Sequence, residues 1–221
     1  MIDANELGRG IRQIYPFDVY LKGVLLALVA AGAVAFFLLA AVKYLIFTES
    51  SYTIWWVNRW PLLVHVICGS IALFAGPVQF IALIRNRYLR VHRAIGAMYV
   101  GSVMIGSLSG YYLAFNSVVG PLLGYSLVVL STAWLATTLV ALACILQYRI
   151  AEHRLWMTRS YIVTFAFVGF RFLFETPFLA DFPPHERSAV IIWFAWIPTL
   201  LVFEVGRQVH SLVSRKMLPA H

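Results

Sequence analysis

Two short phrases of the sequence, RVHRAIGAMY and AEHRLWMTRSY, place a histidine beside an arginine where an apolar run begins. A histidine imidazole can ligate haem iron, and an arginine guanidinium pairs well with carboxylates and phosphates. His92 with Arg93 and His153 with Arg154 are therefore candidates for one shared site, as axial ligands and propionate partners of a b-type haem. The competing interpretation makes each pair a simple anchor for lipid phosphates.

Charged and aromatic polar residues inside the apolar runs predict a second site, nearer the opposite face of the membrane. A charge at the bilayer centre costs about 2.5–3.5 kcal/mol on insertion scales, so an arginine there is a functional candidate. The predicted polar pocket comprises His65, Gln79, Tyr111, Tyr112, Arg171 and Glu175. Such a pocket suits a quinone head group or a short proton path. The alternative is an ion pair between Arg171 and Glu175 that fixes one helix against its neighbour.

The composition indicates that the chain carrying these residues is a membrane protein. Of the 221 residues, 62% are hydrophobic and 12% are charged, which is more apolar surface than a soluble domain of this length can bury. Several runs reach or nearly reach the ~20 residues that cross a bilayer core. They are 23–42, 60–84, 94–115, 118–148, 155–178 and 188–206. The sequence predicts an all-α, six-transmembrane-helix bundle that forms a single domain over 1–221.

The positions of lysine and arginine predict the orientation of this bundle. Most of the 17 basic residues fall on one side if both termini are cytoplasmic, as the positive-inside rule requires. The net charge of +8 then reflects topology and contact with anionic lipids at the cytoplasmic face, and no nucleic-acid partner is expected. Residues 1–20 are the expected cytoplasmic N-terminal segment. The expected location is the bacterial cytoplasmic membrane.

Small residues follow the histidines along the same helix faces, and two interpretations of them stay open. Gly69 and Gly76 follow His65, and Gly96, Gly106 and Gly110 follow the next histidine. Small residues allow helices to pack closely in lipid. The same faces would let a flat macrocycle lie against the backbone.

Other kinds of site are missing from the sequence. It has no P-loop, no nucleophile elbow and no zinc-type His-Glu motif, so hydrolytic and nucleotide-driven activities have no residues to carry them. The only metal expected is a haem iron held by His92 and His153. Cys68 and Cys144 lie toward opposite faces of the membrane, so no disulfide is expected.

The run from His65 to Val100, followed by HRLWMTRSYIVTFAFVGFR, resembles the predicted bacterial membrane proteins grouped as domain of unknown function 2306. The likeness covers 60–175 and implies a four-helix core there. Its motif residues are His65, Gly69, Gly76, Pro77, Gln79, Phe80, His92, Arg93, Gly96, Trp134, His153, Arg154, Trp156, Met157, Arg159, Ser160, Tyr161 and Arg171. The chain departs from the pattern at Ala97, where the family tends to carry arginine. The resemblance implies no particular activity.

A weaker likeness reaches the b-561 class of transmembrane haem cytochromes, which pass electrons to or from quinol or ascorbate. The order of His, Gly, Gln, Arg, His and Gly is similar to two consecutive helices of that class. The likeness implies a b-type haem on His92 and also on His65. Those proteins use four ligand histidines on four helices, and this chain has too few, so one haem is the expectation.

The leading hypothesis from the sequence is a small membrane redox protein. It would hold one b-type haem or a quinone near the inner face, with Arg171 and Glu175 shaping an outer polar pocket. The alternative is a non-enzymatic accessory or assembly subunit, working with partner subunits or as a homo-oligomer. In that case the His-Arg pairs anchor helices and lipids. A transporter of lipids or small solutes is a third hypothesis.

Overall fold

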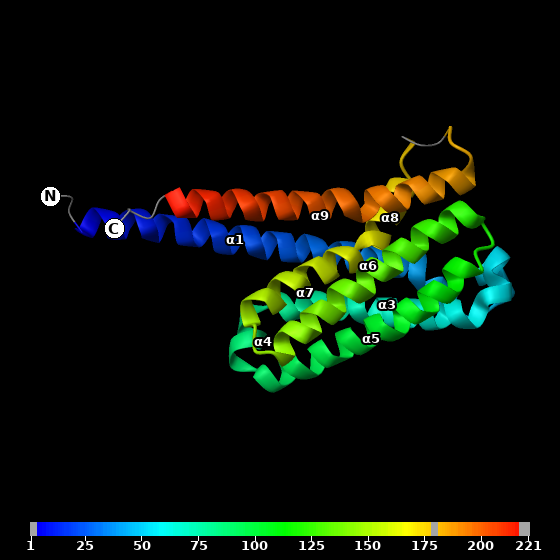
Figure 1. Ribbon diagram of the computed structural model, residues 1–221, viewed down its shortest axis with the longest axis horizontal. Helices are drawn as coiled ribbons and strands as arrows, with labels where there is room; N and C mark the ends of the chain where they lie inside the picture. The colour runs from blue at the N-terminus through cyan, green and yellow to red at the C-terminus, as the bar shows by residue number, and fades with distance from the viewer. Residues whose placement is uncertain (1–3, 178–180, 217–221) are drawn as a thin grey trace.

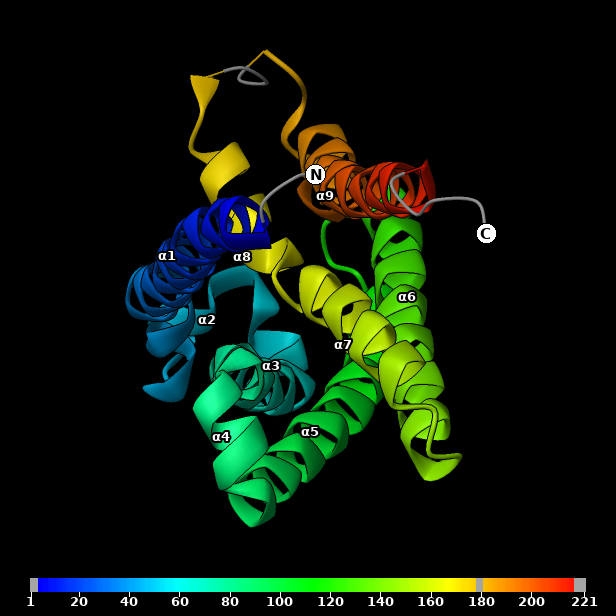
Figure 2. The same ribbon diagram turned by 90° about the vertical axis from the view of Figure 1, so that its left-hand side faces the viewer.

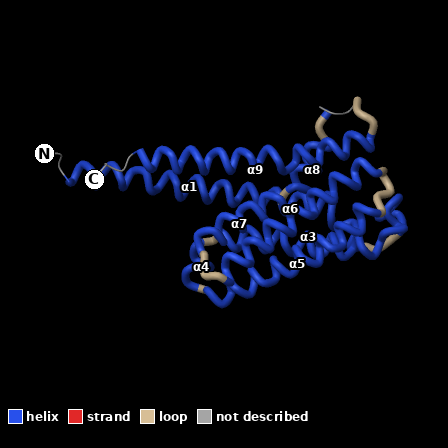
Figure 3. The backbone as a smooth tube through the Cα atoms, viewed as in Figure 1, coloured by secondary structure: helices blue, strands red, loops and turns tan. Residues whose placement is uncertain are grey.

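The structure is a computed structural model that describes residues 4–177 and 181–216, and every regular element in that part of the chain is helical (Figure 3). The predicted all-α fold is confirmed. The helices are α1 (Ala4–Phe36), α2 (Glu49–Tyr52), α3 (Arg59–Phe80), α4 (Ala82–Arg87), α5 (Leu89–Phe115), α6 (Pro121–Leu146), α7 (Ile150–Thr164), α8 (Ala166–Phe174) and α9 (Pro184–Lys216). A π-helical turn, η1 (Phe37–Ala41), and two 3-10 helices, η2 (Val42–Leu45) and η3 (Thr53–Asn58), connect α1 to α3.

Four of these helices form a bundle in which α3 packs on α5, α5 on α6, α6 on α7, and α7 returns to α3 (Figure 2). The long helices α1 and α9 pack outside the bundle and extend past one of its ends (Figure 1). The start of α1 and the end of α9 lie at that same end, which fits an even number of crossings. We call it the basic end, because α4 carries Arg85 and Arg87 there, the first turn of α5 carries Arg90, and Arg149 directly precedes α7.

Within residues 4–177 and 181–216, five segments are long and apolar enough to cross a membrane: Tyr20–Leu45, Glu49–Phe80, Leu89–Phe115, Pro121–Leu146 and Glu186–Val213. Large apolar side chains point outward from them, and Leu39 and Leu108 are 77% and 66% exposed. Lipid tails are the solvent that suits such a surface. The chain is therefore built as an integral membrane protein.

The span expected at 155–178 is divided between two helices. α7 ends at Thr164, whose side-chain hydroxyl donates to the carbonyl of Ser160, and α8 begins again at Ala166. A hydroxyl bonded to the preceding turn competes with the helical backbone pattern and favours a bend. Neither half alone is long enough to cross a bilayer, so the six-span count stays a prediction.

Local sequence sets the two corners that position the functional residues. Gly120 has φ +133°, a conformation that other residues rarely adopt, and Pro121 then starts α6 at a position where proline's missing N–H is not needed. At the basic end, α3 contains Pro77 and ends at Phe80, and Ile81 is extended before α4. The chain therefore turns sharply between α3 and α5.

Candidate functional site

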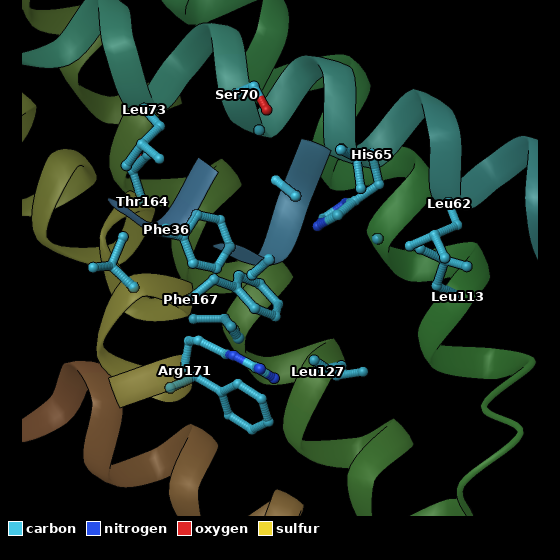
Figure 4. A pocket seen from close by; sticks show the side chains of 18 of the residues that line it. Phe36, Leu62, His65, Ser70, Leu73, Leu113, Leu127, Thr164, Phe167 and Arg171 are labelled. Carbon is cyan, nitrogen blue, oxygen red and sulfur yellow. The ribbon is translucent and has the colours of Figure 1, made fainter. Parts of the chain in front are cut away.

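A cavity of about 300 Å³ lies between α3, α5, α6, α7 and α8 and the segment that follows α1 (Figure 4). Its wall is mainly apolar and includes Phe36, Leu73, Leu127 and Phe167. Several polar side chains interrupt that wall, and they are Lys43, Tyr44, Trp55, His65, Ser70, Ser131, Trp134, Thr164 and Arg171. An apolar cavity with a small number of converging polar groups is the usual form of a small-molecule site.

His65 is held in one orientation in this wall. Its Nδ1 lies 2.9 Å from the carbonyl oxygen of Gly106. A carbonyl oxygen only accepts, so Nδ1 carries the proton and donates, and the neutral ring keeps a lone pair on Nε2. The ring meets Trp134 and Phe167 edge to face, with centroids 6.2 and 5.9 Å away. The imidazole is thus a fixed polar group beside the cavity.

Glycines on α5 make room for this arrangement. A Cβ at Gly106 would lie 3.0 Å from the Trp134 ring, and one at Gly110 would lie 2.8 Å from Oγ of Ser131 and 3.4 Å from the His65 ring. The distances to Trp134 and Ser131 are too short for a Cβ to be added unless these neighbours shift. Close packing around His65 and Trp134 accounts for both glycines.

A buried network of hydroxyl groups forms the floor of the cavity. Tyr99 Oη lies 2.7 Å from Oγ of Ser160 and 2.7 Å from Oγ1 of Thr164. Nε1 of Trp134 donates to Thr164 Oγ1 at 2.8 Å, and Thr138 Oγ1 lies 2.6 Å from Ser160 Oγ. Trp134 and Thr164 also line the cavity, so the network is continuous with its wall. A fully bonded buried network of this kind fixes the packing of α5, α6 and α7.

The structure brings together only part of the predicted polar pocket. His65 and Arg171 both line the cavity. Arg171 pairs with Glu175 at 2.8 Å, and their side chains are 46% and 62% exposed, so this pair lies at the rim and not at the centre of the bundle.

The other members of the predicted pocket lie elsewhere. Tyr111 donates to Oγ1 of Thr132 at 2.9 Å, and Tyr112 is exposed. Gln79 is near the basic end, where its Oε1 would lie 3.3 Å from a Cβ added at Gly96.

Both His-Arg phrases lie at the basic end. His92 is within electrostatic range of His153, Arg93 and Arg154. Nδ1 of His153 donates to the carbonyl of Ala141 at 2.8 Å, so Nε2 of the neutral His153 ring carries a free lone pair. No set of three or more His, Cys, Asp or Glu side chains gathers for a metal ion in the described part of the chain. Cys68 and Cys144 are both free and buried, as expected.

An ion pair between Arg159 and Glu204 joins α7 to α9. Nε of Arg159 donates to Glu204 at 2.6 Å, and Arg207 lies 3.2 Å from the same carboxylate. The Arg159 guanidinium also lies 4.3 Å from the centroid of the Trp156 ring. The side chains of Arg159 and Glu204 are only 15% and 25% exposed, so this contact holds α9 against the bundle.

Comparison with curated proteins and with solved structures gives no significant match. A family model described as predicted membrane protein, DUF2306, matches residues 62–205. The match covers α3 from Leu62 onward, α4 to α8, and most of α9. It therefore includes the helices that supply polar residues to the cavity wall, but not the short segments between α1 and α3 that supply Lys43, Tyr44 and Trp55. The chain belongs to the DUF2306 family of predicted membrane proteins.

Proposed function

We propose that this membrane protein binds the head group of a quinone-class molecule in the cavity beside His65. The observation that carries the proposal is the combination of a mainly apolar cavity of about 300 Å³ with one oriented imidazole in its wall. That volume lies at the lower end of the range for small-molecule sites, about 300–1,000 Å³. It suits one substituted ring and is small for a macrocycle.

The polar groups of the cavity match the oxygens of a quinone and of its reduced form. Nε2 of neutral His65 can accept a hydrogen bond from a quinol hydroxyl. The hydroxyl group of Ser131 can donate to a quinone carbonyl, and its side chain is in the wall. Trp134 and Phe167 offer aromatic edges to the ring itself. The chain would thus contribute binding, orientation and one proton acceptor to redox chemistry that belongs to the ligand.

Fluorescence quenching of the purified, detergent-solubilised protein by a decyl-substituted benzoquinone tests the proposal. We expect saturable quenching, with a smaller amplitude in Trp134→Phe because that indole lies in the cavity wall. We expect His65→Leu to weaken binding about tenfold, which is the loss of one hydrogen bond.

The matched control is His210→Leu, which changes an exposed histidine on α9. If His65→Leu and His210→Leu bound the quinone with equal affinity, the proposed contact between His65 and the quinone would be wrong. Quenching that never saturates would instead favour a non-enzymatic bundle whose cavity holds only lipid tails.

A b-type haem on His92 and His153 is the second candidate. One observation favours it: His153 donates through Nδ1 to a backbone carbonyl, as metal-ligating histidines almost always do, and so presents Nε2. A bound haem would supply one-electron transfer at the basic end. A reduced-minus-oxidised absorbance spectrum of haem-supplied protein should then show b-type bands that disappear in His92→Ala and in His153→Ala. A flat spectrum would eliminate this candidate.

A further inference from the structure

The corner between α3, α4 and α5 at the basic end gathers hydrogen-bond donors that nothing in the described structure satisfies. Gln79 lies in the last turn of α3, Arg85 in α4 and His92 in the first turn of α5. The Gln79 amide reaches Gly96, one helical turn beyond His92 on α5, and Arg85 is within electrostatic range of His92. Three elements therefore each carry one polar side chain in this corner.

Nε2 of Gln79, Nε of Arg85 and Nδ1 of His92 are buried, and each is without a hydrogen-bond partner. Burying a donor without an acceptor costs free energy, and such groups are rare in folded proteins. The guanidinium and the amide can only donate through these nitrogens, and an imidazole can donate through Nδ1. An acceptor with several oxygens would satisfy all of them at once.

The charge of this corner indicates that the acceptor is an anion. His92 is within electrostatic range of Arg85, Arg93, Arg154 and His153. None of the carboxylates that the structure describes pairs with Arg85, Arg93 or Arg154. Glu152, the nearest acidic residue along α7, is already paired with Arg149. The corner therefore carries positive charge that its own side chains do not balance.

We propose that this corner binds a phosphate group, held by Gln79, Arg85 and His92. A phosphate offers more acceptor oxygens than a carboxylate, and guanidinium forks suit it well. The corner lies where α5 enters its membrane-spanning segment, which is the depth of lipid phosphates. The phosphate can belong to an anionic lipid headgroup or to free phosphate, and the binding chemistry is the same for both. This proposal is independent of the cavity beside His65.

Thermal unfolding of the full-length protein in an uncharged detergent tests the proposal. A ligand that binds only the folded state raises the unfolding temperature in a concentration-dependent way. One titration uses short-chain phosphatidylglycerol and a second uses inorganic phosphate, with potassium chloride at matched ionic strength as the control. Stabilisation by the lipid alone identifies a headgroup site, and stabilisation by both probes identifies a general phosphate site. No stabilisation beyond the chloride control by either probe overturns the proposal.

Variants separate this site from general surface charge. We expect Arg85→Gln to weaken phosphate binding at least about tenfold, because a charge-assisted hydrogen bond is lost. The matched control is Arg90→Gln, which removes the same charge from an exposed residue at the same end of the bundle and should keep binding nearly unchanged. Equal weakening in both variants would show that the charge of the surface, and not this corner, attracts the anion.

A second variant keeps the test valid if Arg85→Gln does not fold. Gln79→Leu removes a donor without changing any charge, and we expect it to weaken phosphate binding several-fold. Without phosphate, the same variant should unfold at no lower temperature than the wild type, because it removes an unsatisfied buried donor. An unchanged affinity in Gln79→Leu would overturn the proposed contact.

Discussion

Replacing Gly76 by alanine is the sharpest test of how the bundle is packed. A Cβ at this position would overlap the ring of Tyr161, which comes from α7. Tyr161 must then move, although its hydroxyl donates to the carbonyl of Leu73 at 3.1 Å and its ring packs against Phe80 at 5.7 Å between centroids. The methyl group added by Gly76→Ala would therefore push α3 and α7 apart.

The expected size of the effect follows from these contacts. Overpacking costs about 1–3 kcal/mol, and the lost hydrogen bond about 0.5–1.5 kcal/mol. Alanine gains about 1 kcal/mol over glycine in a helix. Since these contributions partly cancel, we expect Gly76→Ala to lower the free energy of unfolding by about 1–3 kcal/mol.

Equilibrium unfolding in mixed micelles, followed by circular dichroism, measures the difference. The control is Gly69→Ala on the same helix, because no atom lies within 4 Å of the Cβ that it adds. We expect this control to be as stable as the wild type or slightly more stable. Equal destabilisation by the two variants would refute the packing of Tyr161 against Gly76.

Three further substitutions test other contacts by the same unfolding measurement. Tyr99→Phe removes the hydroxyl that joins Ser160 to Thr164, and should lower the free energy of unfolding by about 1–3 kcal/mol. Glu204→Gln leaves the largely buried Arg159 without its counter-charge, so we expect a comparable decrease in the free energy of unfolding. A decrease of only a few tenths of a kcal/mol would mean that α9 is held mainly by apolar contacts. Arg171→Ala removes an exposed pair, so its effect should stay below about 0.5 kcal/mol; a larger loss would contradict the exposed position of this pair.

Much of the helical architecture is predictable from the sequence because long apolar runs in lipid have few alternatives to helix. The break between α7 and α8 is not predictable from the sequence. It depends on a hydrogen bond from the Thr164 hydroxyl to the Ser160 carbonyl, while the same hydroxyl also bonds to Tyr99 and Trp134. The resemblance to domain of unknown function 2306 is confirmed, and the family match extends past the expected end at residue 175 to residue 205, within α9.

The candidate site was predicted only in part, because sequence gives the height of a residue in the membrane and not the direction in which it points. His65 and Arg171 both line the cavity, whereas Tyr111 is hydrogen-bonded to Thr132 instead. The rotation of each helix about its axis depends on packing with its neighbours, which sequence spacing does not specify. The roles of Trp134 and Thr138 were missed for another reason. Neutral hydrogen-bonding side chains in an apolar run do not disrupt its pattern.

Photo-crosslinking in native membranes with an azido-substituted benzoquinone tests the central proposal most directly. The cavity beside His65 predicts label on peptides of α3, α6 and the α7–α8 segment, since these helices supply His65, Trp134 and Thr164 to its wall. An excess of unlabelled quinone should prevent that labelling. Label confined to the outward faces of α1 and α9, and unaffected by the competitor, would contradict a quinone site in this cavity.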